Sequence, residues 1–201
     1  MVTVIGDDPS ARVHEIRDVL ARNNVPFGFY ASDSPEGRAA LRRLGVGRPA
    51  GPVLSLYTGV VLVDPANAEV AGALGMDVRP AGQVYDVVIV GAGPAGLAAA
   101  VYAASEGLST ALLEGEAFGG QAGTSSRIRN YLGFPDGVSG GELAQRAYEQ
   151  AWVFGTHLVY GNAATSLAKD RDLLVVGLED GSQARARAVV IATGEIGRAH
   201  V

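Results

Sequence analysis

Cysteine is absent from all 201 residues of the sequence. A chain without thiols forms no disulfide bond, offers no thiolate nucleophile and provides no sulfur ligand for zinc. Histidine is nearly as scarce, and His14, His157 and His200 lie too far apart in the sequence to suggest a ligand cluster for a metal. We therefore predict no metal site. We also identify no catalytic residue, because no side chain stands in the pattern of an acid, base or nucleophile.

Positive charge and long apolar runs are also in short supply. The 16 Lys and Arg residues are outnumbered by 21 Asp and Glu residues, and the resulting net charge of −5 does not favour nucleic acid or an anionic membrane as a partner. No apolar run reaches the roughly 18 residues that a membrane-spanning helix needs. The first ten residues lack the basic and apolar regions of a signal peptide, so a cytoplasmic location is expected.

Residues 1–80 have the pattern of a small α/β domain. Ser10 is a suitable N-cap for the first helix, in which Val13 and Ile16 fall on one face. The predicted order is strand, helix, strand, helix, strand, strand, helix. These elements are predicted at residues 2–5, 11–23, 27–30, 36–44, 53–56, 60–63 and 64–74. Residues 81–84 have the composition of a domain boundary and are predicted to form a linker.

A glycine-rich turn dominates the rest of the chain. Residues 87–90 are apolar and mostly β-branched, which is typical of a buried parallel strand. Gly91, Gly93 and Gly96 follow with the spacing G-x-G-x-x-G, and a helix is predicted directly after them. In a dinucleotide-binding fold the first glycine allows the sharp turn, the second lets the backbone approach a pyrophosphate, and the third lets helix and strand pack closely. Pro94 suits the first helical turn.

A carboxylate after the next predicted strand supports this interpretation. The apolar strand 110–113 ends at Glu114, which lies 18 residues after Gly96. The acid that binds the ribose hydroxyls of a dinucleotide is expected about 20 residues after the last glycine. The alternative is a glycine-rich turn followed by an unrelated surface glutamate.

Further elements are predicted after this strand. A helix is expected from Glu142 to Phe154, followed by a parallel strand at 156–160. Residues 173–178 and 183–187 are predicted to form a hairpin about Asp180-Gly181. A separate buried strand is predicted at 188–192.

Five segments together resemble the thioredoxin reductase family of FAD-dependent pyridine nucleotide-disulfide oxidoreductases. The segments are GAGPAG, LLEGEAFGGQ, IRNYLGFP, SGGELAQRA and VVIATG, and they fall within residues 85–194. The resemblance implies that 85–194 form the first part of a Rossmann-type FAD-binding domain, an α/β fold with a parallel sheet and a β-hairpin or meander. The element order of residues 1–80 resembles thioredoxin and glutaredoxin. The chain is therefore similar to the branch of the family with an N-terminal thioredoxin-like domain.

The same resemblance implies a set of FAD-binding residues. Those that correspond to the pyrophosphate loop are Gly91, Gly93, Pro94, Ala95 and Gly96. Glu114 corresponds to the ribose acid and Ala163 to the adenine contact, while Gly120 and Gln121, Asn130, Thr193 and Gly194 correspond to contacts along the flavin half. Gln121 and Asn130 have ordinary loop capping as an alternative role. Arg129 departs from the acidic residue that is usual before this asparagine.

The thioredoxin-like domain lacks the chemistry of its relatives. Residues 7–10 occupy the place of the CxxC redox pair, and the resemblance implies a cis peptide bond before Pro52. Without thiols this domain cannot exchange disulfides, so a docking or regulatory module and a degenerate structural appendage are equal alternatives. Arg12, His14 and Arg17 suggest a basic patch, with a solvated helix face as the simpler alternative.

The implied activity is hydride transfer from NADPH to FAD, followed by electron transfer to an acceptor such as a thioredoxin-like protein, in a homodimer. The alternatives are a non-catalytic FAD- or dinucleotide-binding module and a flavoprotein with a non-disulfide acceptor. A glycine-loop monooxygenase or NAD-binding enzyme is disfavoured by the GGQ and NYLGFP segments.

The sequence contains a single glycine loop of this kind, so no NADPH domain is recognised. We interpret the chain as a C-terminally truncated fragment that is inactive alone and retains flavin weakly. Residues 195–201 are interpreted as a non-native tail, because one back-translation of EIGRAHV resembles a sequencing-library adapter. The alternative is a genuine C-terminal tail on a short protein.

Overall fold

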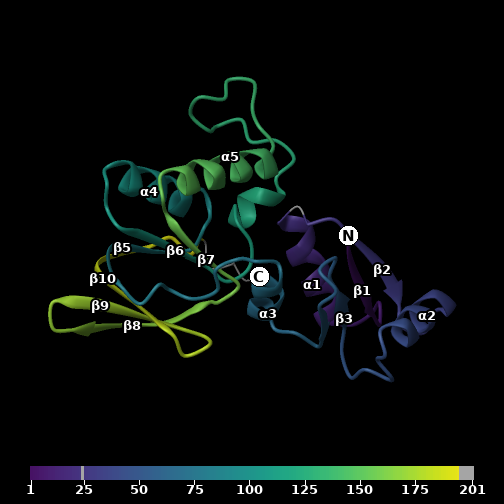
Figure 1. Ribbon diagram of the computed structural model, residues 1–201. Coiled ribbons are helices and arrows are strands. Elements are labelled where there is room, and N and C mark those ends of the chain that lie inside the picture. Colours follow the sequence, from purple (N-terminus) through teal and green to yellow (C-terminus); the bar gives the residue numbers. More distant parts are fainter. Residues whose placement is uncertain (24, 195–201) are drawn as a thin grey trace, which may run out of the picture. The chain divides into compact units, whose positions relative to one another are not determined.

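A computed structural model describes residues 1–23 and 25–194 (Figure 1). The chain divides into two compact units between Met76 and Asp77, and each unit is described by itself. Residues 77–84, which include the predicted linker at 81–84, belong to the second unit. The predicted tail at 195–201 lies outside the described residues. No helix in the described part of the chain has the length and apolar character needed to cross a membrane.

The first unit contains a four-stranded sheet in the order β2-β1-β3-β4. Strand β2 is parallel to β1, whereas β3 is antiparallel to β1 and β4 is antiparallel to β3. The predicted order of strands and helices is confirmed. The elements are β1 (Val2–Gly6), α1 (Ala11–Arg22), β2 (Phe27–Ala31), α2 (Pro35–Arg43), β3 (Val53–Ser55), β4 (Val61–Val63) and α3 (Asn67–Ala73).

Local polar contacts start the helices of this unit. The hydroxyl of Ser10 accepts the Val13 N–H at the start of α1, as predicted, and Ser34 accepts the Gly37 N–H at the start of α2. One core cluster of this unit joins Ile16 of α1 with the sheet.

Two arginines of α1, Arg12 and Arg17, are paired with neighbours. Arg12 lies 2.8 Å from the carboxylate of Glu15 and donates to Asn67, while Arg17 lies 2.8 Å from the carboxylate of Asp8. This arrangement supports the solvated helix face over a basic patch, because Arg12 and Arg17 each have an acidic partner.

The peptide bond before Pro52 is trans, which corrects the expectation of a cis bond. The described residues contain no cis peptide bond. The Pro52 carbonyl accepts the Asp64 N–H at 2.7 Å, so the backbone here continues directly into the β3–β4 pairing. This extended path is compatible with the trans isomer, which X–Pro bonds ordinarily prefer.

The second unit contains a six-stranded sheet in the order β7-β6-β5-β10-β9-β8. The first four of these strands are parallel, and β9 and β8 extend the sheet in antiparallel fashion. The predicted α/β class with a Rossmann-type parallel sheet and a meander is confirmed. The strands are β5 (Val84–Val90), β6 (Thr110–Glu114), β7 (His157–Tyr160), β8 (Ala164–Asp170), β9 (Leu173–Leu178) and β10 (Gln183–Ile191).

Two helices and one 3-10 turn complete this unit. Helix α4 (Pro94–Ser105) packs against α5 (Gly140–Val153), and their shared apolar cluster includes Leu97 and Ala151. The 3-10 turn η1 (Gly120–Thr124) precedes α5. Helix α5 begins two residues before its predicted start, because Ser139 accepts the Glu142 N–H as its N-cap.

Two features of the meander differ from the predictions. Residues 183–191 form one continuous strand instead of two, because β10 pairs with β9 through its first half and with β5 through most of its length. Strand β8 was not predicted, since its residues are largely exposed and lack a strong apolar pattern.

A buried tyrosine holds the segment that leads into β5. The Tyr85 side chain is fully buried, and its hydroxyl accepts the Ala81 N–H at 2.9 Å and lies 2.6 Å from His157 Nδ1. The opposite ring nitrogen of His157 lies 3.3 Å from a carboxylate oxygen of Asp77. Burial, as the main cause, raises the pKa of the Tyr85 hydroxyl. Because this hydroxyl serves two partners, we expect tyrosine to be more stable here than phenylalanine.

Tyr85→Phe should lower the free energy of unfolding of the second unit by about 1–3 kcal/mol, because the Ala81 N–H and His157 Nδ1 lose their buried partner. Urea unfolding followed by the fluorescence of Trp152, the single tryptophan, measures this change. Tyr102→Phe is the control, since Tyr102 is 74% exposed and its loss of a hydroxyl should change stability by less than about 0.5 kcal/mol. Equal stability of the two variants would contradict the prediction.

Candidate functional site

The glycine turn between β5 and α4 combines two tightly packed glycines with one open glycine. A Cβ on Gly96 would overlap the Gly91 carbonyl oxygen, and a Cβ on Gly91 would press against the backbone of Ala192. Gly91 also has φ of 99°, a value that favours glycine. Gly93, in contrast, has no described atom within 4 Å of its Cβ position. The predicted division of roles therefore agrees with the packing around the first and third glycines.

The N-terminus of α4 is open to an anion. Gly93 is the N-cap and makes no side-chain capping bond, and Pro94 occupies the first turn, where it loses no helical hydrogen bond. The first N–H groups of a helix have no partner within the helix, and they carry a partial positive charge. Free N–H groups beside the open space at Gly93 form the arrangement that binds phosphates in dinucleotide-binding folds.

The Glu114 carboxylate connects the glycine turn to the end of β6. One oxygen accepts the Ala92 N–H at 2.7 Å, and the other accepts the N–H groups of Glu116 and Ala117 at 2.8 and 3.2 Å. Hydrogen bonds from backbone N–H groups to a carboxylate are among the stronger ones in proteins. Glu114 thereby fixes the relative positions of two loops at the carboxyl edge of the sheet.

Other predicted residues gather at the same edge. A Cβ on Gly120 would lie 3.2 Å from the Cα of Gly93. A Cβ on Gly115 would lie 3.0 Å from the Cβ of Ala163. At the end of β10, a Cβ on Gly91 would lie 3.1 Å from the Cα of Thr193, which Gly194 follows. The carboxyl ends of parallel strands are where open α/β sheets bind ligands.

Ala95, Gln121 and Asn130 are less closely connected to this edge. Ala95 is exposed in the first turn of α4, and Gln121 is exposed in η1, where its carbonyl accepts the Thr124 hydroxyl. Asn130 is exposed, and no hydrogen bond of its side chain is found within the described residues.

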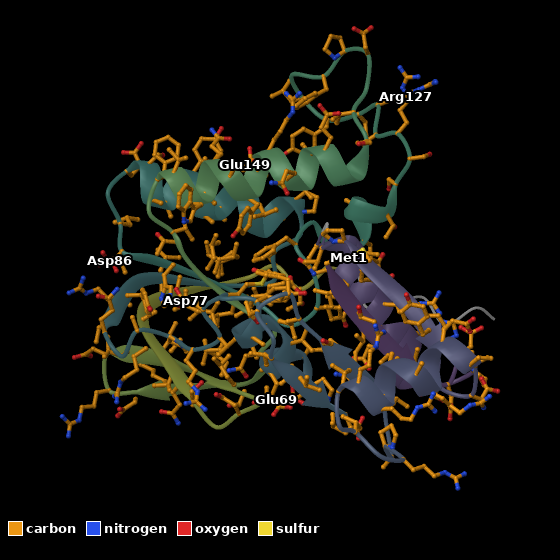
Figure 2. All side chains as sticks on the ribbon, turned by 45° about the vertical axis from the view of Figure 1, so that its right-hand side comes forward. Met1, Glu69, Asp77, Asp86, Arg127 and Glu149 are labelled. Atoms are coloured by element: carbon orange, nitrogen blue, oxygen red, sulfur yellow. The ribbon has the colours of Figure 1, made fainter. Side chains whose placement is uncertain are left out.

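Asn130 lies in the segment between η1 and α5, which projects beyond α5 (Figures 1 and 2). Backbone hydrogen bonds between Ile128 and Val138 close the base of this segment. Tyr131 lines an apolar crevice with Pro94 and other residues of α4, η1 and α5, and it lies near Phe134, with ring centroids 6.1 Å apart. Both rings are only half-buried, so they are not core aromatics.

Sequence reasoning missed two residues at this edge. Ala92 is completely buried, donates to Glu114 and accepts the Gly119 N–H at 2.8 Å. Asn162 is 1% exposed, donates from its amide to the Val78 carbonyl at 2.9 Å and accepts the Asp180 N–H at 3.2 Å. The only signal for Asn162 in the sequence is a polar residue that follows a buried strand and a glycine.

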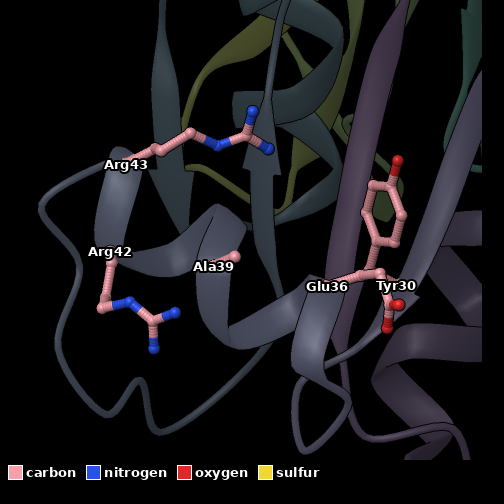
Figure 3. A pocket seen from close by; sticks show the side chains of 5 residues that line it. All are labelled: Tyr30, Glu36, Ala39, Arg42 and Arg43. Atoms are coloured by element: carbon pink, nitrogen blue, oxygen red, sulfur yellow. The ribbon is translucent and has the colours of Figure 1, made fainter.

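A separate open hollow of about 610 Å³ lies on the first unit (Figure 3). Tyr30 of β2 lines it together with Glu36, Ala39, Arg42 and Arg43 of α2. The two arginines belong to the last turn of α2, where cations are stabilised by the negative end of the helix dipole. The place of the two arginines at the end of α2 explains their presence, and Glu36 adds a negative charge. We therefore assign no ligand to the hollow.

The family of the chain follows from comparison with known proteins. A family model described as pyridine nucleotide-disulphide oxidoreductase matches residues 85–200, which is more than half of the chain. The chain therefore belongs to this family, and the resemblance predicted from the motifs is confirmed.

Thioredoxin reductases are among its relatives. That of Aquifex aeolicus is 40% identical over 119 residues, which are 59% of this chain and 36% of the relative. The bifunctional thioredoxin reductase/thioredoxin of Mycobacterium leprae is 38% identical over 111 residues, which are 55% of this chain and 24% of the relative. The crystal structure of Streptococcus pyogenes thioredoxin reductase matches with a TM-score of 0.54 and 40% identity, over 57% of this chain and 37% of that one. The chain thus spans less than two fifths of the length of these proteins.

Gly96→Ala should lower the free energy of unfolding by about 3 kcal/mol or more, because the added methyl group would overlap the Gly91 carbonyl and displace the turn. Gly93→Ala should cost about 1 kcal/mol at most, since its Cβ enters open space and only the N-cap preference changes. Urea unfolding monitored at Trp152 compares the two variants. A Gly96→Ala protein as stable as Gly93→Ala would show that the close packing is not required.

Proposed function

We propose that the carboxyl edge of the second sheet binds FAD, and that the chain is part of an oxidoreductase that resembles thioredoxin reductase. The observation that carries the proposal is the open glycine turn with free helical N–H groups, held beside Glu114, in a chain of this family.

The adenosine diphosphate half of FAD has the better-defined site. Gly93, Pro94 and Ala95 would face the pyrophosphate, with Gly91 and Gly96 shaping the turn. The carboxylate of Glu114 accepts three N–H groups, and a carboxylate has about four acceptor positions, so one remains for a ribose hydroxyl. Ala163, which lies against Gly115, would offer its backbone to the adenine.

The flavin half would follow the loops beyond the glycine turn. Gly120, which packs against Gly93, would let the ribityl chain pass, and Thr193 and Gly194 would border it from the end of β10. The amides of Gln121 and Asn130 can both donate and accept hydrogen bonds to the ring system. Their exposure leaves them available for such contacts.

FAD would supply the redox chemistry by accepting a hydride from NADPH and releasing electrons to an acceptor. The residues of this chain would bind the cofactor, orient it and exclude water from the pyrophosphate. We propose a thioredoxin-like protein as the acceptor, because a relative combines thioredoxin reductase and thioredoxin in one chain. Any thiol in this reaction must come from outside these 201 residues, which contain no cysteine.

We propose a cytoplasmic homodimer for the whole protein, and a thioredoxin-like fold without redox activity for the first unit. The strand order of this unit supports the latter assignment. A docking or regulatory role and a purely structural role are both compatible with the absence of thiols.

A second function has a specific observation in its favour. Because the chain has no cysteine, it would also suit a protein that binds FAD or another dinucleotide without reducing disulfides. Oxidation of NADPH by the full-length gene product in the presence of FAD, with thioredoxin or a dye as acceptor, separates these functions. Turnover with both acceptors supports the reductase, turnover with the dye alone supports a different acceptor, and binding without turnover supports the module.

ADP, the half of FAD that the glycine turn would hold, should bind to this chain, and Gly93→Ala should weaken its binding by about tenfold or more. The added methyl group enters the space proposed for the pyrophosphate. Isothermal titration calorimetry measures both affinities. Gly47→Ala is a matched control, because its Cβ also meets no described atom within 4 Å but lies in the first unit. Equal ADP affinity of the Gly93→Ala and unaltered proteins would place the ligand elsewhere.

A further inference from the structure

The segment that connects the two units, residues 77–83, is anchored along the second unit. We call it the connecting segment. Its first anchor is the Asp77 carbonyl, which accepts the Tyr160 N–H at 2.8 Å. The preceding residue, Met76, donates its own N–H to Ala71 in the first unit at 3.1 Å. Consecutive residues are therefore hydrogen-bonded within different units.

Further anchors follow along the connecting segment. Arg79 forms an ion pair of 2.7 Å with Asp180, and Gln83 donates to the Ser109 hydroxyl at 3.3 Å. Ala81 donates to Tyr85, as described above. The pKa of the Asp180 carboxyl is well below its usual range, mainly because the Ser182 hydroxyl donates to it. Asp180 therefore stays ionised near neutral pH and keeps its attraction for Arg79.

Asn162 is the buried centre of these contacts. Its amide joins the Val78 carbonyl of the connecting segment to the Asp180 N–H of the β9–β10 turn. Asn162 itself is buried, so removing its amide would break two hydrogen bonds at once, one to each side. Val78 is therefore held in place by a side chain of the β7–β8 loop.

The same loop forms the proposed adenosine end of the site. Gly161 donates its N–H to the Glu114 carbonyl at 2.7 Å, and the Ala163 carbonyl accepts the Glu179 N–H at 2.9 Å. Asn162 stands between these two residues. Gly161 is hydrogen-bonded to the backbone of the proposed ribose acid, and Ala163 is the proposed adenine contact. One short loop thus contacts both the connecting segment and the adenosine end.

We propose that Asn162 is a positioning residue that couples the connecting segment to the adenosine end of the cofactor site. This inference rests on the proposed function, because it places adenosine at residues 161–163. A ligand that orders this loop also orders Val78 through Asn162. By linkage, ordering of the connecting segment and binding of the ligand strengthen each other by the same factor. Loosening the segment at Asn162 must therefore weaken ligand binding by that factor.

Hydrogen–deuterium exchange of the connecting segment, measured with and without saturating ADP, tests this coupling. In the unaltered protein ADP should slow exchange at residues 77–81 by about threefold or more. In Asn162→Ala this slowing should disappear, and ADP affinity measured by calorimetry should fall by the same factor, about threefold or more. If Asn162 had a structural role alone, its replacement would raise exchange equally with and without ADP and leave the ADP affinity unchanged.

Gln83→Ala is the matched control, since it loosens the same segment at its far end, beside Ser109, and does not touch the β7–β8 loop. It should leave ADP affinity unchanged. Arg79→Gln provides a second measurement if Asn162→Ala does not fold, because it removes an exposed ion pair of the same segment. It should reduce the ADP-dependent slowing.

The outcomes separate this inference from the proposed function. ADP binding with no change in exchange at 77–81 would overturn the coupling alone. Absence of ADP binding to the unaltered protein would overturn both.

Discussion

The hydrogen bond from the Ala92 N–H to the Glu114 carboxylate is the contact on which the edge of the second sheet depends. It joins the turn after β5 to the turn after β6. The second oxygen of the carboxylate accepts the N–H groups of the residues that follow, Glu116 and Ala117. A charged acceptor with several N–H donors stabilises a loop more than neutral side chains would. The glycine turn is consequently shaped before a ligand arrives, so binding does not have to order it.

Close packing and open space alternate around this contact. Gly91 and Gly96 are positions where the fold itself excludes a side chain, whereas Gly93 borders space that the protein leaves unfilled. This contrast distinguishes glycines that the packing of the fold requires from one that borders the proposed ligand site. It also explains why the glycine spacing alone is weak evidence, since two of its three positions would be needed for packing in any protein with this turn.

Family membership covers the second part of the chain and not the first unit. Membership of the pyridine nucleotide-disulphide oxidoreductase family concerns residues 85–200, while the first unit is described by its own sheet and core. Because this chain contains no cysteine, its own residues cannot carry out disulfide chemistry, whatever cofactor it binds. The proposed role of Asn162 adds a physical connection between the site and the segment where the two units join, through contacts that involve no catalytic group.

The sequence by itself determined the order of elements in the first unit, the glycine turn, the acid at position 114 and the family, because all of these depend on local spacing and residue type. Tertiary structure alone decided the continuity of β10, the trans bond at Pro52 and the existence of β8, whose exposed residues are ordered by pairing with β9. It also decided the partners of Ala92, Tyr85 and Asn162. These contacts join residues far apart in the chain, and no local pattern records which polar group will be buried beside which.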